Sequence, residues 1–116
     1  MRDPEGDAPR KAALEAISRG LAKTTRNSGV TVNSLQPGST LTEGAVAFLE
    51  NQAAQTGNTA EQVANDFFVS QRPASTLQRF AHVDEVATTI VYYCSPLAAA
   101  TNGSTIAVDG GSTLGG

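Results

Sequence analysis

The sequence contains few of the residues that form disulfides and bind metal ions. Its 116 residues include one cysteine, Cys94, and one histidine, His82. A single cysteine excludes a disulfide within the chain and a cysteine-based zinc site. A single histidine excludes a site with several histidine ligands. We therefore predict that the chain holds no metal ion.

Positive charge and long apolar runs are also scarce. Eight lysines and arginines stand against eleven aspartates and glutamates, which gives a formal net charge of −3 at pH 7. Nucleic acids and anionic membranes attract basic surfaces, so we expect neither as a partner. No apolar run reaches the roughly 18 residues of a membrane span, and the polar N-terminal segment does not resemble a signal peptide. These features predict a soluble, cytoplasmic protein.

Large side chains are few, because aromatic residues make up 5% of the sequence and tryptophan is absent. The length corresponds to one domain. Residues 1–9 contain two prolines, one glycine and three acidic residues, which favour a flexible arm. Residues 112–116 are expected to form a flexible tail. The domain should therefore span residues 10–111, around a core that is poor in large side chains.

Hydrophobic periodicity and turn residues predict the elements of this domain. Thr42 is expected to cap a helix, and Thr59 to Gln62 fit a capping box for the next helix. We expect the amide-rich stretch 50–58 between these helices to be a mobile joint. Cys94 falls on an apolar helix face and is expected to be buried. The expected elements are a helix over 10–26, a strand over 30–35, helices beginning at 43 and after 59, a helix over 83–94 and a strand over 105–108.

The order of these elements predicts the fold class. A strand, a helical crossover and a second strand are typical of a parallel α/β unit. We therefore predict an α/β fold in which two parallel strands are surrounded by helices. Parallel sheets usually have more strands and are covered on both faces, so the pattern corresponds to about half of a larger fold.

Several short motifs follow one another in an order that resembles one family. The motifs are Lys11-Ala-Ala-Leu14, Val30-Thr-Val-Asn33, Pro37-Gly38 with Thr42, Arg79-Phe80, Asp84-Glu85-Val86-Ala87, Tyr93-Cys94-Ser95-Pro96, Asn102-Gly103 and Val108-Asp109-Gly110-Gly111. Together they resemble the C-terminal half of the short-chain dehydrogenases/reductases, over residues 10–111. That family has a doubly wound α/β fold, binds NAD or NADP, and moves a hydride between the nicotinamide and a carbonyl or alcohol carbon. The resemblance therefore implies a partial Rossmann-like fold for this chain.

The resemblance implies candidate site residues. Lys11 matches the family's active-site lysine, which lowers the pKa of a catalytic tyrosine. Pro37, Gly38, Thr40 and Thr42 match a loop whose backbone contacts the nicotinamide and whose threonine hydroxyl reaches the pyrophosphate. The alternative from the residues themselves is a solvated Lys11, a Pro-Gly turn and a helix cap at Thr42.

The chain departs from the family pattern at the catalytic residues. Asp7 stands four residues before Lys11, where the family has its acid/base tyrosine. The 116 residues contain no match to the upstream catalytic serine, and no glycine-rich phosphate loop opening a helix. We therefore expect a truncated relative of NAD(P)-dependent oxidoreductases that is not catalytically self-sufficient. Whether it binds NAD, NADP or neither is left open.

Two other functions stay open beside that expectation. One is a non-catalytic oligomerisation or interaction module, and the other is an enzyme completed by a chain that supplies the cofactor-binding half. Bare strand edges and uncovered apolar faces favour association. We therefore expect a homo-oligomer, with exchanged elements or with a full-length relative as the partner.

Overall fold

The computed structural model describes residues 4–113. The chain divides into two compact units, and both strands and helix α4 contribute residues to each. Unit 1 contains the described residues up to Gln36 together with Ala87–Ile106. Unit 2 contains Pro37–Val86 and the described residues from Ala107 onward. Among the described residues, no helix is both long enough and apolar enough to cross a membrane.

Two parallel strands, β1 (Ser34–Pro37) and β2 (Thr105–Val108), form the sheet. The backbone N–H of Ser34 donates to the carbonyl of Ser104 at 3.0 Å, and that of Gly38 donates to the carbonyl of Val108 at 2.9 Å. Both partners advance by the same number of residues in the same direction, so the strands are parallel. The predicted α/β fold with two parallel strands is confirmed.

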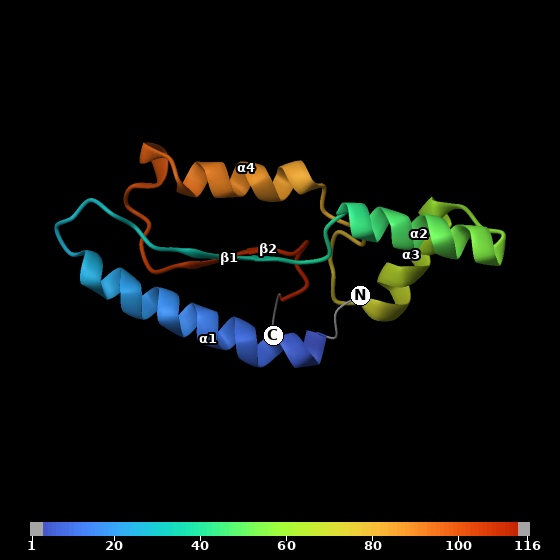
Figure 1. The fold of residues 1–116 in the computed structure, drawn as a ribbon, viewed down its shortest axis with the longest axis horizontal. Coiled ribbons are helices and arrows are strands. Elements are labelled where there is room, and N and C mark those ends of the chain that lie inside the picture. Colours follow the sequence, from blue (N-terminus) through green and yellow to red (C-terminus); the bar gives the residue numbers. More distant parts are fainter. Residues whose placement is uncertain (1–3, 114–116) are drawn as a thin grey trace. The chain divides into compact units, whose positions relative to one another are not determined.

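Unit 1 places its helices on either side of the strands. Helix α1 (Pro4–Ala22) lies along one side of the strand pair, and most of α4 (Val83–Tyr93) lies along the other (Figure 1). Two asparagine side chains accept hydrogen bonds from the backbone of the loops at the amino ends of the strands. Asn102 accepts from the Val32 N–H at 2.8 Å, and Asn33 accepts from the Ser104 N–H at 2.9 Å.

Two boundaries in unit 1 differ from the prediction. Helix α1 begins at Pro4, so residues 4–9, expected to form a flexible arm, are helical. Proline suits the first position of a helix because its missing N–H has no helical partner there. The strand expected over 30–35 is shifted to Ser34–Pro37, because Val32 bonds to Asn102 and Gly103 instead of joining the ladder. The rest of the expected arm, residues 1–3, lies outside the described part.

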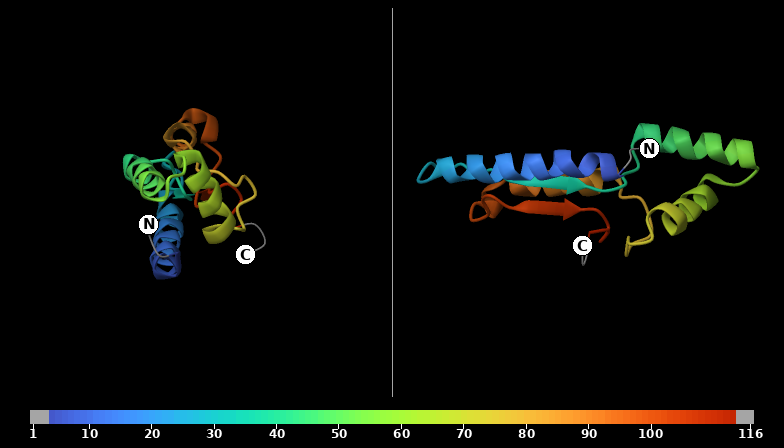
Figure 2. Two further views of the ribbon diagram at one scale, coloured as in Figure 1. Left: turned by 90° about the vertical axis from the view of Figure 1, so that its right-hand side faces the viewer. Right: turned by 90° about the horizontal axis from the view of Figure 1, so that it is seen from below.

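Unit 2 contains a helical hairpin made of α2 (Glu43–Thr56) and α3 (Ala60–Gln71), shown in the right-hand view of Figure 2. Each helix begins at a threonine cap, as predicted for Thr42 and Thr59. The expected mobile joint over 50–58 is wrong for most of its length, since α2 continues to Thr56. Alanine and glutamine propagate a helix well, and Gly57 ends it in the left-handed conformation, at φ 71°.

Three aromatic rings form the core of unit 2. Phe68 is 2% exposed, and its ring meets that of Phe80 edge to face with centroids 4.9 Å apart. Phe67 stacks on Phe80 at 5.4 Å. Leu49 on α2 joins the same buried cluster, so the core holds the hairpin against the segment around Phe80.

Unit 1 buries much less, which fits the expectation of a thin core. Ala22 and Ala98 are its buried apolar residues within the described range. The expectation that Cys94 is buried is wrong, because Cys94 is exposed. Ile90 and Val91 on the preceding helix α4 are also exposed, so the apolar face of α4 is exposed at these positions.

Candidate functional site

The candidate site lies at the carboxyl ends of the two parallel strands. Loop 37–42 follows β1, and turn 109–113 follows β2; both belong to unit 2. In open parallel α/β sheets, ligands bind outside the carboxyl ends of the strands. Four of the five candidate residues from the sequence, Pro37, Gly38, Thr40 and Thr42, lie in loop 37–42.

Gly38 brings loop 37–42 and turn 109–113 into direct contact. Its backbone N–H donates to the Val108 carbonyl at 2.9 Å. A Cβ atom at position 38 would lie 2.8 Å from both Cα and Cβ of Asp109. Because the nearest atom belongs to the backbone, the neighbour has little room to move, and only glycine fits this position.

Asp109 fixes the turn on its side of that contact. Its Oδ1 accepts from the Gly111 N–H at 3.0 Å, and its Oδ2 accepts from the Thr113 hydroxyl at 2.8 Å. Residue 113 is therefore held in the turn, although it belongs to the segment expected to form a flexible tail. Gly110 and Gly111 adopt positive φ angles of 63° and 86°, which suit glycine.

The two threonines of loop 37–42 organise the backbone around them. The Thr40 hydroxyl donates to the Gly38 carbonyl at 2.9 Å. The Thr42 hydroxyl oxygen accepts from the Ala45 N–H at 3.2 Å, which makes it the cap of α2. Thr42 is exposed, and its hydroxyl hydrogen is not used by that contact. A cap and a ligand contact are therefore compatible at this residue.

A short parallel bridge ties the loop to residue 81. The Leu41 N–H donates to the Ala81 carbonyl at 2.8 Å, and the Ala81 N–H donates to the Ser39 carbonyl at 2.9 Å. These bonds use the Ser39 carbonyl and the Leu41 N–H, which lie on either side of Thr40 in the chain. The Thr40 carbonyl itself accepts from the Thr42 N–H at 2.8 Å.

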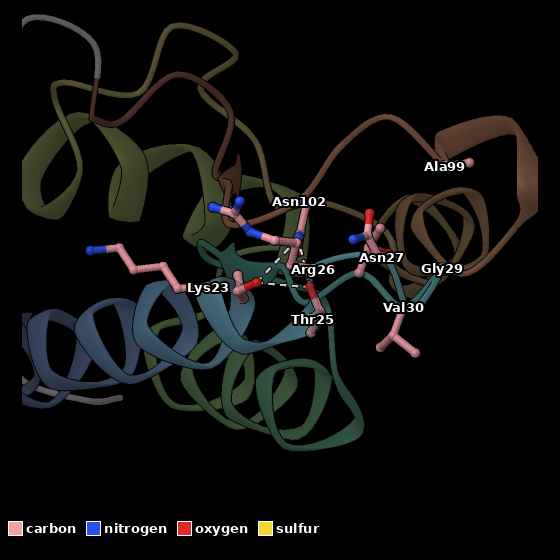
Figure 3. A pocket seen from close by; sticks show the side chains of 10 residues that line it. Lys23, Thr25, Arg26, Asn27, Gly29, Val30, Ala99 and Asn102 are labelled. Atoms are coloured by element: carbon pink, nitrogen blue, oxygen red, sulfur yellow. Dashed lines mark hydrogen bonds between the residues drawn. The ribbon is translucent and has the colours of Figure 1, made fainter.

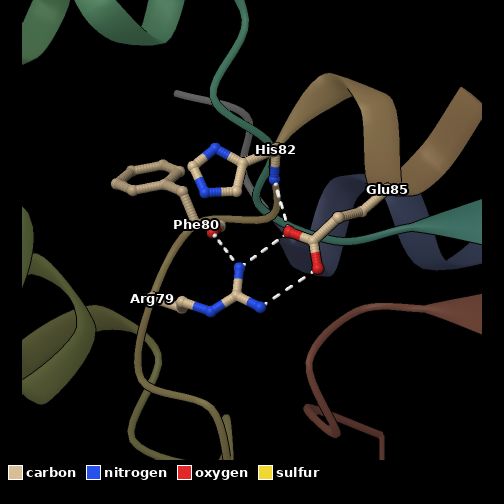
Figure 4. A network of polar contacts seen from close by, with 4 residues as sticks. All are labelled: Arg79, Phe80, His82 and Glu85. Atoms are coloured by element: carbon tan, nitrogen blue, oxygen red, sulfur yellow. Dashed lines mark hydrogen bonds and ion pairs between the residues drawn. The ribbon is translucent and has the colours of Figure 1, made fainter.

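An arginine–glutamate pair borders the same bridge (Figure 4). Arg79 Nη1 and Nη2 donate to Glu85 Oε1 and Oε2 at 2.8 and 3.0 Å, a bidentate pair. Glu85 Oε1 also accepts from the His82 N–H at 2.9 Å. The hydrogen bonds from the Arg79 side chain and the His82 backbone lower the pKa of Glu85 from 4.5 to about 2. The pKa of Arg79 is raised by the same hydrogen bond.

The lowered pKa of Glu85 predicts acid-sensitive stability. Ionised Glu85 stabilises the folded state above pH 4.5, its ordinary pKa, and this contribution is lost as the pH falls through about 2. We expect Glu85→Gln to flatten the fall in thermal unfolding temperature over this range. Glu61→Gln, which removes a carboxylate from the first turn of α3, is the control. Equal acid sensitivity in wild type and Glu85→Gln would contradict the assignment.

Each unit contains a cavity. One, of about 150 Å³, lies in unit 2 beside Ser39, Arg79, Ala81 and Asp109. Pockets for small-molecule ligands usually have about 300–1,000 Å³, so this cavity does not enclose a dinucleotide.

The other cavity, of about 390 Å³, lies in unit 1 beside Lys23, Arg26 and Asn102. It sits at the carboxyl end of α1, where the helix dipole is negative and disfavours a phosphate. Figure 3 shows Lys23 extending away from Asn27 and Val30. Asn102 is occupied with the Thr25 hydroxyl at 2.9 Å. We therefore assign this cavity no ligand.

Lys11 belongs to a different unit from the residues of loop 37–42. It is exposed on α1 and belongs to unit 1, whereas the loop belongs to unit 2. Residue-by-residue interpretation of the sequence missed the contacts of Asp109 and the Arg79–Glu85 pair. The sequence contains their motifs, Val-Asp-Gly-Gly and Arg-Phe. It does not show the contacts, because Asp109 meets Gly38 from far along the chain and a turn separates Arg79 from Glu85.

Comparison with known proteins identifies the family. The model of a family described as enoyl-(acyl carrier protein) reductase matches residues 6–113. The chain belongs to the short-chain dehydrogenase/reductase family. Uncharacterized oxidoreductase YvrD of Bacillus subtilis is 43% identical over 101 residues, which cover 87% of this chain and 38% of YvrD. D-beta-hydroxybutyrate dehydrogenase of Rhizobium meliloti is 34% identical over 113 residues, which cover 91% of this chain and 43% of that enzyme.

Solved structures of short-chain dehydrogenases/reductases agree with the fold. L-sorbose reductase from Gluconobacter frateurii, complexed with NADPH and L-sorbose, aligns with a TM-score of 0.75 at 28% identity. The alignment covers 90% of this chain and 38% of the reductase chain. The chain thus spans about two fifths of the length of the curated relatives it matches.

Proposed function

We propose that this chain forms the part of an NAD(P)(H)-dependent oxidoreductase that holds the nicotinamide end of the cofactor in loop 37–42. The observation that supports this most is the contact of Gly38 with Asp109, which fixes the loop at the carboxyl end of β1. The backbone around Thr40 would contact the carboxamide, and the Thr42 hydroxyl would donate to the pyrophosphate. The related reductase bound to NADPH supports the choice of cofactor.

The reaction we propose is hydride transfer between the nicotinamide and a carbonyl or alcohol carbon. The names of two relatives, a hydroxybutyrate dehydrogenase and a sorbose reductase, support this class of substrate. Such a reaction needs a proton donor of high pKa at the substrate oxygen. Asp7 occupies the position of the family's tyrosine, and an aspartic acid, with a reference pKa of about 3.9, is too acidic to replace a phenol as this donor. The 116 residues alone should therefore bind dinucleotide without turning it over.

Two matched threonine variants test the cofactor site. Thr42 and Thr59 each cap a helix in unit 2, through hydrogen bonds of 3.2 and 3.1 Å. Thr42→Ala and Thr59→Ala should each cost about 1 kcal/mol of stability. Only Thr42→Ala should weaken binding of NADH or NADPH, by about fivefold to tenfold in calorimetric titration. Equal affinity in the two variants would overturn the assignment of Thr42.

A second candidate function, self-association, is favoured by exposed apolar side chains on α1. Leu14, Ile17 and Leu21 are 52%, 66% and 53% exposed, and they recur at helical spacing. An exposed apolar stripe of this kind marks an interaction surface. A second copy of the chain, or the part of a relative that completes the sheet, would cover it. Mixing with a full-length relative tests whether such a partner also restores turnover.

Ile17→Glu tests this second candidate. Placing a charge in an apolar contact should shift the mass in solution from oligomer to monomer, measured by light scattering. Ala54→Glu, on an exposed position of α2, is the control and should leave the mass unchanged. A monomeric wild-type chain would rule self-association out.

A further inference from the structure

We propose that Arg79 and Glu85 are positioning residues that hold loop 37–42 in its binding conformation. Neither side chain belongs to the loop, and neither is assigned a contact with the cofactor. They act on it through the backbone of residue 81. The effect on dinucleotide affinity rests on the proposed function, whereas the effect on the loop itself does not.

One carboxylate holds both ends of a short segment. Glu85 accepts two hydrogen bonds from the Arg79 guanidinium and one from the His82 N–H. Arg79 Nη1 also donates to the Phe80 carbonyl at 3.0 Å. The backbone is therefore held at Phe80 and at His82, on both sides of Ala81, the residue that meets the loop.

Ala81 transmits this constraint to the loop. Its N–H and carbonyl bond to Ser39 and Leu41, the neighbours of Thr40. A displacement of residue 81 would break two of the bonds that orient Thr40, while the Gly38 contact with Asp109 would remain. The loop thus has two independent supports, turn 109–113 at its beginning and residue 81 at its middle.

The other side of the segment is anchored in the core, which makes a selective test possible. Phe80 is 7% exposed and packs among the aromatic rings of α3. The side chains of Arg79 and Glu85 are 46% and 42% exposed. The pair can therefore be altered at the surface while the aromatic core keeps unit 2 folded.

Amide hydrogen exchange at Leu41 and Ala81 measures directly how well the hydrogen bonds between residue 81 and loop 37–42 are maintained. Arg79→Gln and Glu85→Gln should each speed exchange of these two amides by about tenfold, because loss of the pair favours local opening. Glutamine can still accept from the His82 N–H, as in other capping boxes, so Glu85→Gln removes mainly the contact with Arg79. The double variant should exchange no faster than the faster single variant, since the two residues act as a pair.

Three controls separate positioning from general destabilisation. Exchange at Val63, which bonds to Thr59 in α3, should stay unchanged in every variant. Glu61→Gln should leave Leu41 and Ala81 unchanged. Arg79→Lys keeps the charge but loses the fork geometry, and should give an intermediate rate. Rates at Leu41 and Ala81 within about twofold of wild type in Arg79→Gln and Glu85→Gln would overturn the proposal.

Titration with NADH and NADPH separates this proposal from the proposed function. If both hold, Glu85→Gln should weaken binding by about threefold to tenfold, and Glu61→Gln should not. If wild type binds neither dinucleotide, the proposed function is overturned, and the exchange rates still decide the positioning role. If Glu85→Gln exchanges and binds as wild type does, the positioning role fails while the proposed function stands.

Discussion

Gly38→Ala is expected to lower the thermal unfolding temperature by about 10–15 °C, corresponding to roughly 3 kcal/mol. The added Cβ would lie 2.8 Å from Cα of Asp109, so the loop or turn 109–113 must move to admit it. Movement of either would also weaken the hydrogen bond between Gly38 and Val108. Differential scanning calorimetry of the variant and wild type gives the shift.

Gly20→Ala is the matched control for that substitution. Gly20 lies within α1, and a Cβ atom added there would meet no neighbouring group within 4 Å. Alanine in a helix interior is more favourable than glycine by about 1 kcal/mol, so the control should stabilise the chain. A Gly38→Ala variant as stable as wild type would show that turn 109–113 yields easily, contrary to a fixed loop.

Phe68→Ala should destabilise the chain by about 3–5 kcal/mol, the usual range for removing a buried aromatic ring. Phe68 is the most buried member of the aromatic cluster, at 2% exposure, and it contacts both Phe67 and Phe80. Its loss removes the packing that holds α3 against the segment next to loop 37–42. Urea unfolding monitored by circular dichroism measures the change in free energy.

The neighbouring residue supplies the control for Phe68→Ala. Val69 follows Phe68 in the same helix but is 70% exposed. Val69→Ala should therefore change the free energy of unfolding by less than about 0.5 kcal/mol. Similar losses for the two variants would contradict the assignment of Phe68 to the core of unit 2.

Local rules predicted the features of the fold that depend on near neighbours. The threonine caps at 42 and 59 follow from side chains that bond three residues ahead. Strand β2 and the helix over 83–93 follow from short apolar patterns, and the parallel pairing follows from the crossover between the strands. The motifs in loop 37–42 placed four candidate residues at one strand end.

Other features depend on contacts that the sequence pattern does not reveal. Glycine at position 38 is required by the approach of Asp109, which lies far away in the chain. The apolar pattern of α4 predicted that Cys94 would be buried, but periodicity shows only which face is apolar and not whether another element covers it. The strand expected from residue 30 begins later because Asn102 takes the backbone of Val32.

Each structural feature around loop 37–42 depends on the one before it. A parallel strand pair places the loop beside turn 109–113, and Gly38 lets the two touch. The capped start of α2 and the bridge to Ala81 then fix the threonines of the loop. Membership of the short-chain dehydrogenase/reductase family gives this arrangement its proposed role at the nicotinamide end of the cofactor.

The most direct test of that role is amide chemical-shift mapping of the labelled 116-residue chain with millimolar NADH or NADPH. We predict shift changes centred on residues 38–42, with much smaller changes when adenosine, which lacks both the nicotinamide and the pyrophosphate, replaces the dinucleotide. Binding near a dissociation constant of about 1 mM, equivalent to about 4 kcal/mol, would be sufficient to observe them. No change in loop 37–42 with either dinucleotide, or changes confined to other residues, would contradict the proposed role.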